Sequence, residues 1–284
     1  MRAAGPAPVS EAGPGMADAK KFFLVTGACG GLGSAVTDLL AAGGSQVYAA
    51  DSDGEALGTL ASKEHVRPLL LDVRDSSSLS EACDLIQQSA PRLDGIVCGA
   101  GVYIGGPLLN VAEDEIRRAL DVNVMGAVLV VQHLFPLLRE GSRLVFISSE
   151  STRVAVPFTG PYVMSKRALE AFADTLRREL LPLGIGVTVV QPGAIRTPLL
   201  SSAARSLASD LALPIYRKGL QSAASVLENE KRTGLDPARV AQVIVHVLES
   251  RRPPLLCRIG NDPARALLSH LPARWIDALV RRFL

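Results

Sequence analysis

The sequence predicts an α/β fold in which one parallel sheet is covered by helices on both faces. Short apolar segments alternate with longer segments of helical periodicity, an order typical of a doubly wound parallel sheet. The chain has 284 residues, 48% of them hydrophobic, which suffices for one large core. It contains no internal repeat at the periods of about 20 to 50 residues that mark solenoids. We therefore expect one folded domain.

Short apolar runs are the expected strands, because continuous apolar runs are typical of sheets buried on both faces. They span residues 21–25, 46–50, 66–71, 93–98, 143–148, 186–191 and 254–259. The expected helices span residues 32–42, 78–90, 113–138, 162–182 and 238–249. Two helix starts carry capping signals: Ser78 with Glu81 resembles a capping box, and Asp236 precedes the helix-compatible Pro237.

The two ends of the chain differ from the domain, which we place at residues 20–262. Residues 1–19 are rich in Ala, Gly and Pro and lack the apolar run of a secretion signal, so we expect a disordered extension. Residues 263–284 place leucines, a tryptophan and arginines at helical spacing, which predicts an amphipathic helix. That helix is compatible with docking on the domain, closing a pocket, meeting another subunit or peripheral membrane contact. We favour protein packing.

Composition argues against several classes of partner. The formal net charge is +2 and aromatic residues are 4% of the chain, so we expect no nucleic-acid binding. The four cysteines lack Cys-x-x-Cys spacing and the four histidines form no helical pair, so we expect no metal site and a reducing, cytoplasmic location. No apolar run approaches the roughly 18 residues that cross a bilayer, the longest lying near residues 124–131, so we expect no transmembrane segment.

A glycine-rich turn at residues 26–33 lies between the first strand and the first helix. Missing side chains let the backbone approach a pyrophosphate, and the amides and positive dipole end of the helix favour its charge. The turn predicts a dinucleotide site, with an ordinary flexible loop as the alternative. The residues expected to contact the cofactor are Gly27, Cys29, Gly30, Gly31, Leu32 and Gly33. Cys29, near the helix N-terminus, is the one cysteine with a candidate lowered pKa.

Asp51 ends the second strand, about twenty residues beyond the glycine turn, where a dinucleotide fold places its ribose-binding acid. Its carboxylate would accept hydrogen bonds from ribose hydroxyls and repel a 2′-phosphate. Neither the turn nor the residues just after Asp51 supply an arginine to neutralise that phosphate. The sequence therefore favours NAD over NADP, although an aspartate after a strand is also a common turn former.

Tyr162 and Lys166 are candidates for chemistry because a helix places residues four apart on one face. A neighbouring ammonium favours the phenolate, which predicts a tyrosine pKa lowered from about 10 toward neutrality, as acid-base catalysis prefers. Ser149 follows the apolar segment 143–148 and would expose its hydroxyl at a strand's carboxyl end. Taken alone, the Tyr-Lys pair also fits a solvated helix.

Together these signatures resemble the short-chain dehydrogenase/reductases, over residues 20–259. The resemblance rests on Thr26-Gly27-x-x-x-Gly31-x-Gly33, Ala100-Gly101, Asn123, Ser149, Tyr162-x-x-x-Lys166 and Pro192-Gly193. It implies a Rossmann fold in which Tyr162 is the acid-base and Ser149 hydrogen-bonds the substrate oxygen. Lys166 would lower the tyrosine pKa and hold the nicotinamide ribose, and Asn123 would anchor a water in the proton relay. Helices 113–138 and 162–182 would form a homodimer or homotetramer.

The same resemblance implies further cofactor contacts. They are Asp72 and Val73 after the third strand, Gly99, Ala100 and Gly101 after the fourth, and Pro192, Gly193, Ile195 and Thr197 after the sixth, besides Tyr162 and Lys166. Asp72 is equally compatible with a turn residue, and Pro-Gly with a simple turn. The family's Asn-Asn-Ala-Gly is Cys98-Gly99-Ala100-Gly101 here, so a bracing asparagine is absent. The doubled glycine also fits sugar-nucleotide epimerases, but the chain lacks room for their substrate domain.

Substrate selection depends on the segments that overhang the strand ends, at residues 102–107, 150–159 and 199–234, the last forming a helical lid. Their apolar side chains would line a pocket for a lipophilic molecule or bury the lid against the domain. They are Tyr103, Ile104, Val154, Val156, Phe158, Leu199, Leu207, Leu211, Leu213, Ile215 and Tyr216. We predict substrate contacts from Ser149, Tyr103, Val156 and Phe158. Some steroid and retinoid dehydrogenases resemble the chain in such a lid and tail.

The expected activity is NAD-dependent hydride transfer between nicotinamide and a lipophilic secondary alcohol or ketone, such as a steroid or retinoid. Tyr162 would exchange the hydroxyl proton. A non-catalytic dinucleotide-binding scaffold or redox sensor is the alternative, because this fold does not guarantee chemistry.

Overall fold

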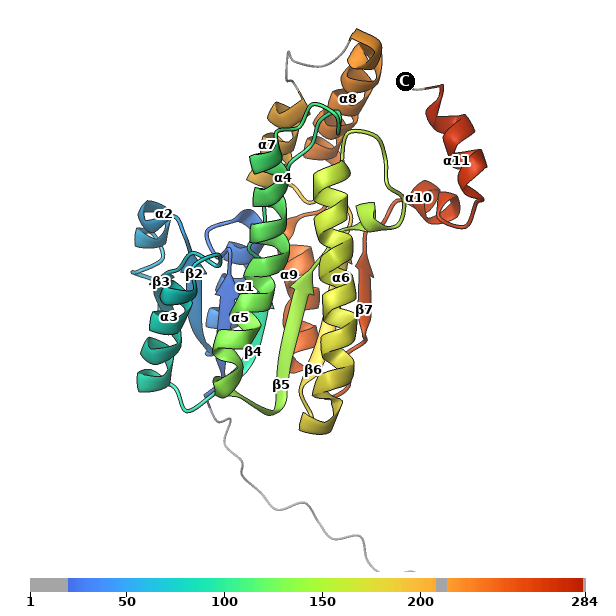
Figure 1. Cartoon of the computed structure of the whole chain (residues 1–284). Coiled ribbons are helices and arrows are strands. Elements are labelled where there is room, and N and C mark those ends of the chain that lie inside the picture. The colour runs from blue at the N-terminus through green and yellow to red at the C-terminus, as the bar shows by residue number, and fades with distance from the viewer. Residues whose placement is uncertain (1–19, 208–213, 283–284) are drawn as a thin grey trace, which may run out of the picture.

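A computed structural model describes residues 20–207 and 214–282, arranged as a central sheet between two layers of helices (Figure 1). The expected extension at residues 1–19 lies outside the described residues, as do Leu211 and Leu213 of the expected lid.

The sheet is parallel and seven-stranded, with the order β3-β2-β1-β4-β5-β6-β7. Its strands are β1 Phe22–Thr26, β2 Gln46–Asp51, β3 Val66–Leu70, β4 Leu93–Cys98, β5 Leu138–Ile147, β6 Gly186–Pro192 and β7 Leu256–Ile259. The chain turns from one half of the sheet to the other between β1 and β4, so their carboxyl ends border the crevice where such folds bind ligands. The predicted doubly wound class is confirmed.

Helices cover both faces, and each face has its own apolar core (Figure 1). One face carries α3 Ser76–Ser89, α4 Glu113–Leu120, α5 Gly126–Leu134 and α6 Gly160–Leu180. The other carries α1 Gly31–Ala42, α2 Gly54–Gly58 and α9 Pro237–Glu249. The aromatic rings of Phe23, Tyr48 and Phe146 are fully buried among aliphatic side chains on the two faces, which agrees with the predominantly apolar strand segments.

The helix expected at 113–138 is interrupted. A π-helical turn, η1 Asp121–Met125, separates α4 from α5, and the 3-10 turn η2 Phe135–Leu137 follows. Such π turns occur frequently at functional sites, and this one contains the buried Asn123. Taken as one helical stretch, Glu113–Leu137 is long and apolar enough to cross a membrane. The apolar run near residues 124–131, on which the sequence prediction was based, is shorter. Length and composition do not separate a span from a core helix, and these helices pack on the sheet.

Helix capping agrees with one expected start and differs at the other. Asp236 caps α9 by accepting a hydrogen bond from the Ala238 amide at 2.9 Å, as predicted. The capping box expected at Ser78 is wrong, because α3 starts two residues earlier. There the Asp75 carboxylate accepts from the backbone amide and the hydroxyl of Ser77 at 2.9 and 2.7 Å.

The lid and the C-terminal segment lie beyond the carboxyl ends of the strands (Figure 1). The lid contains α7 Pro198–Leu207, η5 Pro214–Tyr216 and α8 Arg217–Thr233, which pack around Ala203, Leu207, Leu220, Leu227 and Phe158. Residues 263–284 were expected as one helix, but the structure has two, α10 Pro263–Leu268 and α11 Ala273–Val280. Pro272, which has no amide hydrogen to donate, lies just before α11 and separates them.

Candidate active site

Two positions of the glycine turn between β1 and α1 have no room for a side chain. Gly27 has φ +70°, and a Cβ there would lie 2.8 Å from the backbone nitrogen and Cα of Ala100. At Gly33, a Cβ would lie 2.1 Å from the Gly27 carbonyl oxygen. These two glycines therefore let the turn fold back on itself and pack against the loop that follows β4.

Helix α1 begins at the mouth of this turn without a side-chain cap. Gly30 is the capping residue and offers no side chain to the first-turn amides, which leaves that end of the helix suited to an anion. A Cβ on Gly31 would lie 2.8 Å from Cγ2 of Thr197. The glycine turn thus meets the segment after β6 that contains Gly193 and Ile195. Two stretches predicted to contact the cofactor are brought together.

Asp51 ends β2 beside the same turn. Its carboxylate accepts hydrogen bonds from the Cys29 amide at 2.9 Å and from the Asp53 amide at 3.2 Å. The carboxylate is therefore held at the crevice edge, where the ribose was expected. Cys29 was only a candidate for a lowered pKa, and the structure contradicts it: burial, and then the charges of Asp51 and Asp53, raise the pKa of the thiol to about 11.

A threonine hydroxyl braces the loop after β4, where the sequence lacks the expected asparagine. Thr26 Oγ1 accepts hydrogen bonds from the amides of Gly99 and Ala100 at 3.1 and 3.3 Å and donates to the Val97 carbonyl at 3.3 Å. Cys98 is fully buried, and burial raises the pKa of its thiol to about 12. Although the expected asparagine is missing, Thr26 therefore still ties this loop to β1.

Asp72 and Val73 follow β3, and the structure uses them differently. The Asp72 carboxylate pairs with the Arg74 guanidinium at 2.6 Å, which lowers the pKa of the carboxyl. Val73 is buried against α5, since a Cβ on Gly126 would lie 2.6 Å from Val73 Cγ2. Contact of Asp72 with an adenine ring stays a prediction.

Asn123, in the π turn, links the loop after β4 to α6. Its Oδ1 accepts from the Val102 amide at 2.8 Å, and its Nδ2 donates to the Val102 carbonyl at 2.9 Å and to Ser165 Oγ at 2.8 Å. Both amide hydrogens are thereby used, and the side chain is 1% exposed. Asn123 is a brace in this arrangement, and the relay water stays a prediction.

Tyr162 and Lys166 lie in the first two turns of α6, on the face directed at the ends of β4 and β5. The Lys166 ammonium donates to the Ile147 carbonyl at 2.8 Å and lies 5.8 Å from the centre of the Tyr162 ring. A Cβ on Gly101 would lie 3.4 Å from Lys166 Nζ. Ser149 lies close enough to Tyr162 for its hydroxyl to oppose, through hydrogen bonding, the rise in the pKa of the phenol. The three groups predicted for catalysis therefore meet at one place.

The pKa of Tyr162 is not lowered as expected. Burial raises it, and the hydrogen bond with Ser149 opposes that rise only in part. Burial also lowers the pKa of Lys166 to about 8, against the attraction of Glu170. The spacing of the two residues predicts only an effect of the ammonium charge, whereas in the folded structure burial is the largest influence on both pKa values.

Glu170 is a site residue that the sequence argument missed. Four residues after Lys166, its Oε1 accepts hydrogen bonds from Ser148 Oγ, from Thr152 Oγ1 at 2.9 Å and from Gln191 Nε2 at 2.7 Å. It therefore ties α6 to the ends of β5 and β6 on either side of Ser149. Its spacing of four from Lys166 was a usable signal, because it places both on one helix face.

The residues predicted to contact substrate fall into two groups. Tyr103 lies against Tyr162, with ring centroids 4.7 Å apart, and Val156 is partly exposed. Phe158 packs edge-on against Tyr216 in the lid core, which favours the packing alternative for that ring. Ile215 is 74% exposed and so does not line an enclosed pocket. Within residues 20–207 and 214–282, no group of three metal-ligating side chains gathers.

A glycine turn at the crevice of a parallel sheet, near a Ser-Tyr-Lys cluster, is the arrangement typical of dinucleotide-binding α/β proteins with an acid-base site. Residues 21–208 match the family model described as short chain dehydrogenase. The chain belongs to the short-chain dehydrogenase/reductase family and is an oxidoreductase of that family.

Curated relatives cover much of the chain. Retinol dehydrogenase 5 of Mus musculus is 32% identical over 279 residues, 91% of this chain and 87% of that protein. The 3-ketodihydrosphingosine reductase of Bacteroides thetaiotaomicron is 29% identical over 84% of this chain and 88% of that protein. A 3-amino-tetrahydro-pyrrolizinone reductase of Xenorhabdus hominickii is 39% identical, but the match spans only 63% of each chain.

Solved structures share the fold. A short-chain dehydrogenase from Streptomyces avermitilis has a TM-score of 0.77 at 27% identity, covering 93% of this chain and 96% of that one. A short chain dehydrogenase/reductase from Burkholderia phymatum, solved in complex with NAD, has a TM-score of 0.76 at 23% identity, covering 92% and 95%. The second likeness concerns the fold alone.

Proposed function

We propose that this protein is an NAD-dependent oxidoreductase that transfers hydride between nicotinamide and a lipophilic secondary alcohol or ketone. The observation that carries the proposal is the meeting of the Ser149 hydroxyl, the Tyr162 phenol and Lys166 beside the glycine turn. Tyr162 is the acid-base, Ser149 holds the substrate oxygen, and Lys166 holds the nicotinamide ribose.

The turn and Asp51 fit a dinucleotide without a 2′-phosphate. Side chains at Gly27, Gly31 and Gly33 would collide with neighbouring atoms, so the backbone itself faces the crevice, as close approach to a pyrophosphate requires. The fixed Asp51 carboxylate is an acceptor for ribose hydroxyls and repels a phosphate. When bound, the dinucleotide supplies or accepts the hydride.

The protein's own groups handle the proton. Because burial raises the pKa of Tyr162, the phenol keeps its proton at neutral pH and can give it to the oxygen of a ketone. In the opposite direction the phenolate accepts the proton of an alcohol, so oxidation gains rate as pH rises. The Ser149 hydroxyl lies beside the phenol and can turn to the same oxygen.

A lipophilic substrate is supported by the surroundings of this cluster. The ring of Tyr103 borders Tyr162 and packs against the apolar core of the lid, and Val156 belongs to a predicted overhanging segment. The names of two relatives, retinol dehydrogenase and 3-ketodihydrosphingosine reductase, point to lipid substrates for those proteins. We assign this chain the same broad class.

The proposal includes a homodimer or homotetramer in the cytoplasm, formed through α4, α5 and α6. This helical face exposes large apolar side chains, among them Met125 at 46%, Phe135 at 42% and Met164 at 44%. Exposed apolar side chains on one helical face support an association surface there when they form a contiguous patch. The molar mass in light scattering, compared between wild type and Met164→Glu, tests this assembly: a monomeric wild type would overturn it.

The decisive test is turnover of steroid, retinoid and aliphatic alcohols and ketones, followed by NADH absorbance. Tyr162→Phe should bind NADH normally yet lose about 10² to 10⁴-fold in kcat. Tyr48→Phe is the matched control, because its phenol is bonded to Ser89 in the core, away from the site. Ordinary turnover by Tyr162→Phe would overturn the assigned proton donor. NADH binding without turnover of any compound by the wild type would instead favour a scaffold or redox sensor.

A further inference from the structure

We propose that Arg265 is a positioning residue that fastens lid helix α8 to the loop carrying Ser149 and so sets how tightly the substrate is held. The inference rests on the proposed oxidoreductase function and adds to it a side chain from the C-terminal segment. Neither the family signatures nor the predicted site includes Arg265.

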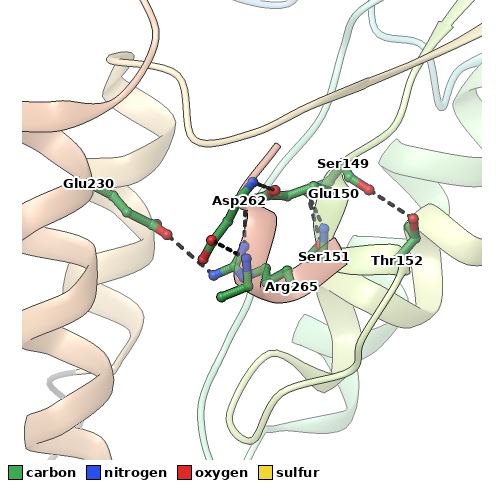
Figure 2. Close-up of polar contacts among 8 residues, drawn as sticks. Ser149, Glu150, Ser151, Thr152, Glu230, Asp262 and Arg265 are labelled. Carbon is green, nitrogen blue, oxygen red and sulfur yellow. Dashed lines mark hydrogen bonds and ion pairs between the residues drawn. The ribbon is translucent and has the colours of Figure 1, made fainter. Parts of the chain in front are cut away.

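One guanidinium joins three distant parts of the chain (Figure 2). Arg265 Nη1 donates to Glu150 Oε1 at 2.8 Å, and Nη2 donates to Glu230 Oε1 at 3.3 Å. Glu150 directly follows Ser149 in the 3-10 turn η3 Glu150–Thr152, Glu230 lies on α8, and Arg265 lies on α10. The cluster therefore connects the catalytic loop, the lid and the C-terminal segment.

The side of the cluster that faces Ser149 is firmly held. Glu150 uses its other oxygen, Oε2, to accept from the Asp262 amide at 2.8 Å, so it also fixes the start of α10 (Figure 2). A second bond joins the other ends of the two elements: Arg153, just after η3, donates through Nη2 to Oγ of Ser269, just after α10, at 3.0 Å. Because η3 and α10 are tied at both ends, they behave as one unit, and α8 is the part that the Arg265 bond can hold or release.

Burial makes the guanidinium necessary to the lid contact. The exposed fractions of the side chains are 5% for Glu150, 22% for Glu230 and 23% for Arg265. Two carboxylates thus share one guanidinium in a partly buried environment, where an unpaired charge is strongly disfavoured. Burial already raises the pKa of Glu230. Without Arg265 the Glu230 carboxylate would take up a proton or turn to water, and α8 would loosen from η3.

The cluster lies close to Tyr103, one of the residues proposed to contact the substrate. The charges of Glu230 and Arg265 both act on the Tyr103 phenol, whose ring borders Tyr162. A loosened α8 would therefore widen the space beside Tyr103 while leaving the glycine turn, Asp51 and Lys166 in place. The expected signature is weaker substrate binding with cofactor binding preserved.

The test compares Arg265→Gln, Glu230→Gln and the conservative Arg265→Lys in the full chain. Since the lost hydrogen bond joins two charged groups, Arg265→Gln should raise KM about tenfold or more, with a smaller change in kcat and an NADH Kd within about twofold of wild type. Arg265→Lys should recover part of the KM. Arg274→Gln, on the exposed surface of α11, is the matched control and should leave all three constants unchanged.

Amide hydrogen exchange of α8, residues 217–233, supplies a readout that needs no substrate. Exchange there should rise in Arg265→Gln and in Glu230→Gln, and the double variant should add little further. Unchanged exchange and unchanged KM in Arg265→Gln would overturn the proposal, as would a parallel loss of NADH affinity and thermal stability, which would indicate general damage. Faster α8 exchange in a protein that turns over nothing would uphold the fastening and reject the proposed function alone.

Discussion

The ring of Tyr103 lies against the ring of Tyr162, with centroids 4.7 Å apart and an angle of 34° between the ring planes. Tyr103 comes from the loop after β4 and Tyr162 from the start of α6, so the contact closes one side of the catalytic cluster. Burial raises the pKa of both phenols, and for Tyr103 the direction is reinforced by Tyr162. The ring of Tyr103 thus helps to keep water away from Tyr162, the proposed proton donor.

Replacement of Tyr103 separates the effect of its ring from that of its hydroxyl. Tyr103→Phe keeps the ring contact and should retain kcat/KM within about threefold, whereas Tyr103→Ala should lose about tenfold, since such an aromatic pair contributes about 0.5 to 1.5 kcal/mol beyond the buried area. By admitting water, Tyr103→Ala should also shift the pH profile of kcat/KM toward a lower Tyr162 pKa. Equal losses in the two variants would assign the effect to the hydroxyl and contradict this account.

Most strand bounds were predicted to within one or two residues because the strands are predominantly apolar, but the start of β5 was not. The sequence placed its start at residue 143, whereas β5 begins at Leu138, beyond a register shift against β4 between Leu93 and Gly95. Residues 139–141 are polar and exposed, so no apolar signal marks them as strand. The π turn at Asn123 was equally hidden, since one extra residue in a turn leaves the apolar pattern of a buried helix intact.

The positions of the site residues were predictable, but their ionisation was not. Gly27, Ser149, Tyr162 and Lys166 each sit at the end of a strand or the start of a helix, which local pattern reveals. The raised pKa of Tyr162 comes from burial, a property of the folded structure that spacing does not encode. The bond between Arg265 and Glu150 joins residues 115 positions apart, so no local pattern could have revealed it either.

Asp51→Asn tests the assignment of NAD. The substitution removes the negative charge but keeps an oxygen that can accept from the Cys29 amide, so the turn should stay in place. We expect the preference for NADH over NADPH, measured as the ratio of kcat/KM values, to fall about tenfold or more, because like-charge repulsion of a 2′-phosphate is lost. Asp53→Asn, an exposed neighbour that remains a good helix cap, is the control. An unchanged ratio in Asp51→Asn would count against its ribose role.

Gly33→Ala should destabilise the fold and weaken cofactor binding together. Its new Cβ would meet the Gly27 carbonyl oxygen at 2.1 Å, and because that oxygen belongs to the backbone, the turn itself must move. We expect a loss of about 1 to 3 kcal/mol in the free energy of unfolding, as for other overpacked sites, and a raised NADH Kd. Gly58→Ala is the matched control, since a Cβ there meets nothing within 4 Å. Urea denaturation and fluorescence titration measure both effects, and equal behaviour of the two variants would refute the steric argument.

The lowered pKa of Lys166 predicts that the free energy of unfolding rises with pH in an alkaline window. Burial lowers the pKa of its ammonium to about 8 in the folded chain, against 10.5 when exposed. Between these values the unfolded state binds the extra proton, so the contribution of Lys166 to the free energy of unfolding rises with pH, by about 3 kcal/mol at most, and is constant outside the window. Urea denaturation of wild type and Lys166→Met should therefore show a difference that grows in favour of wild type between pH 8 and 10.5.

The lost bond to the Ile147 carbonyl adds an offset that does not vary with pH, and the tyrosines and cysteines that both proteins share largely cancel in the difference. A difference independent of pH would mean that Lys166 keeps its ordinary pKa in the folded protein.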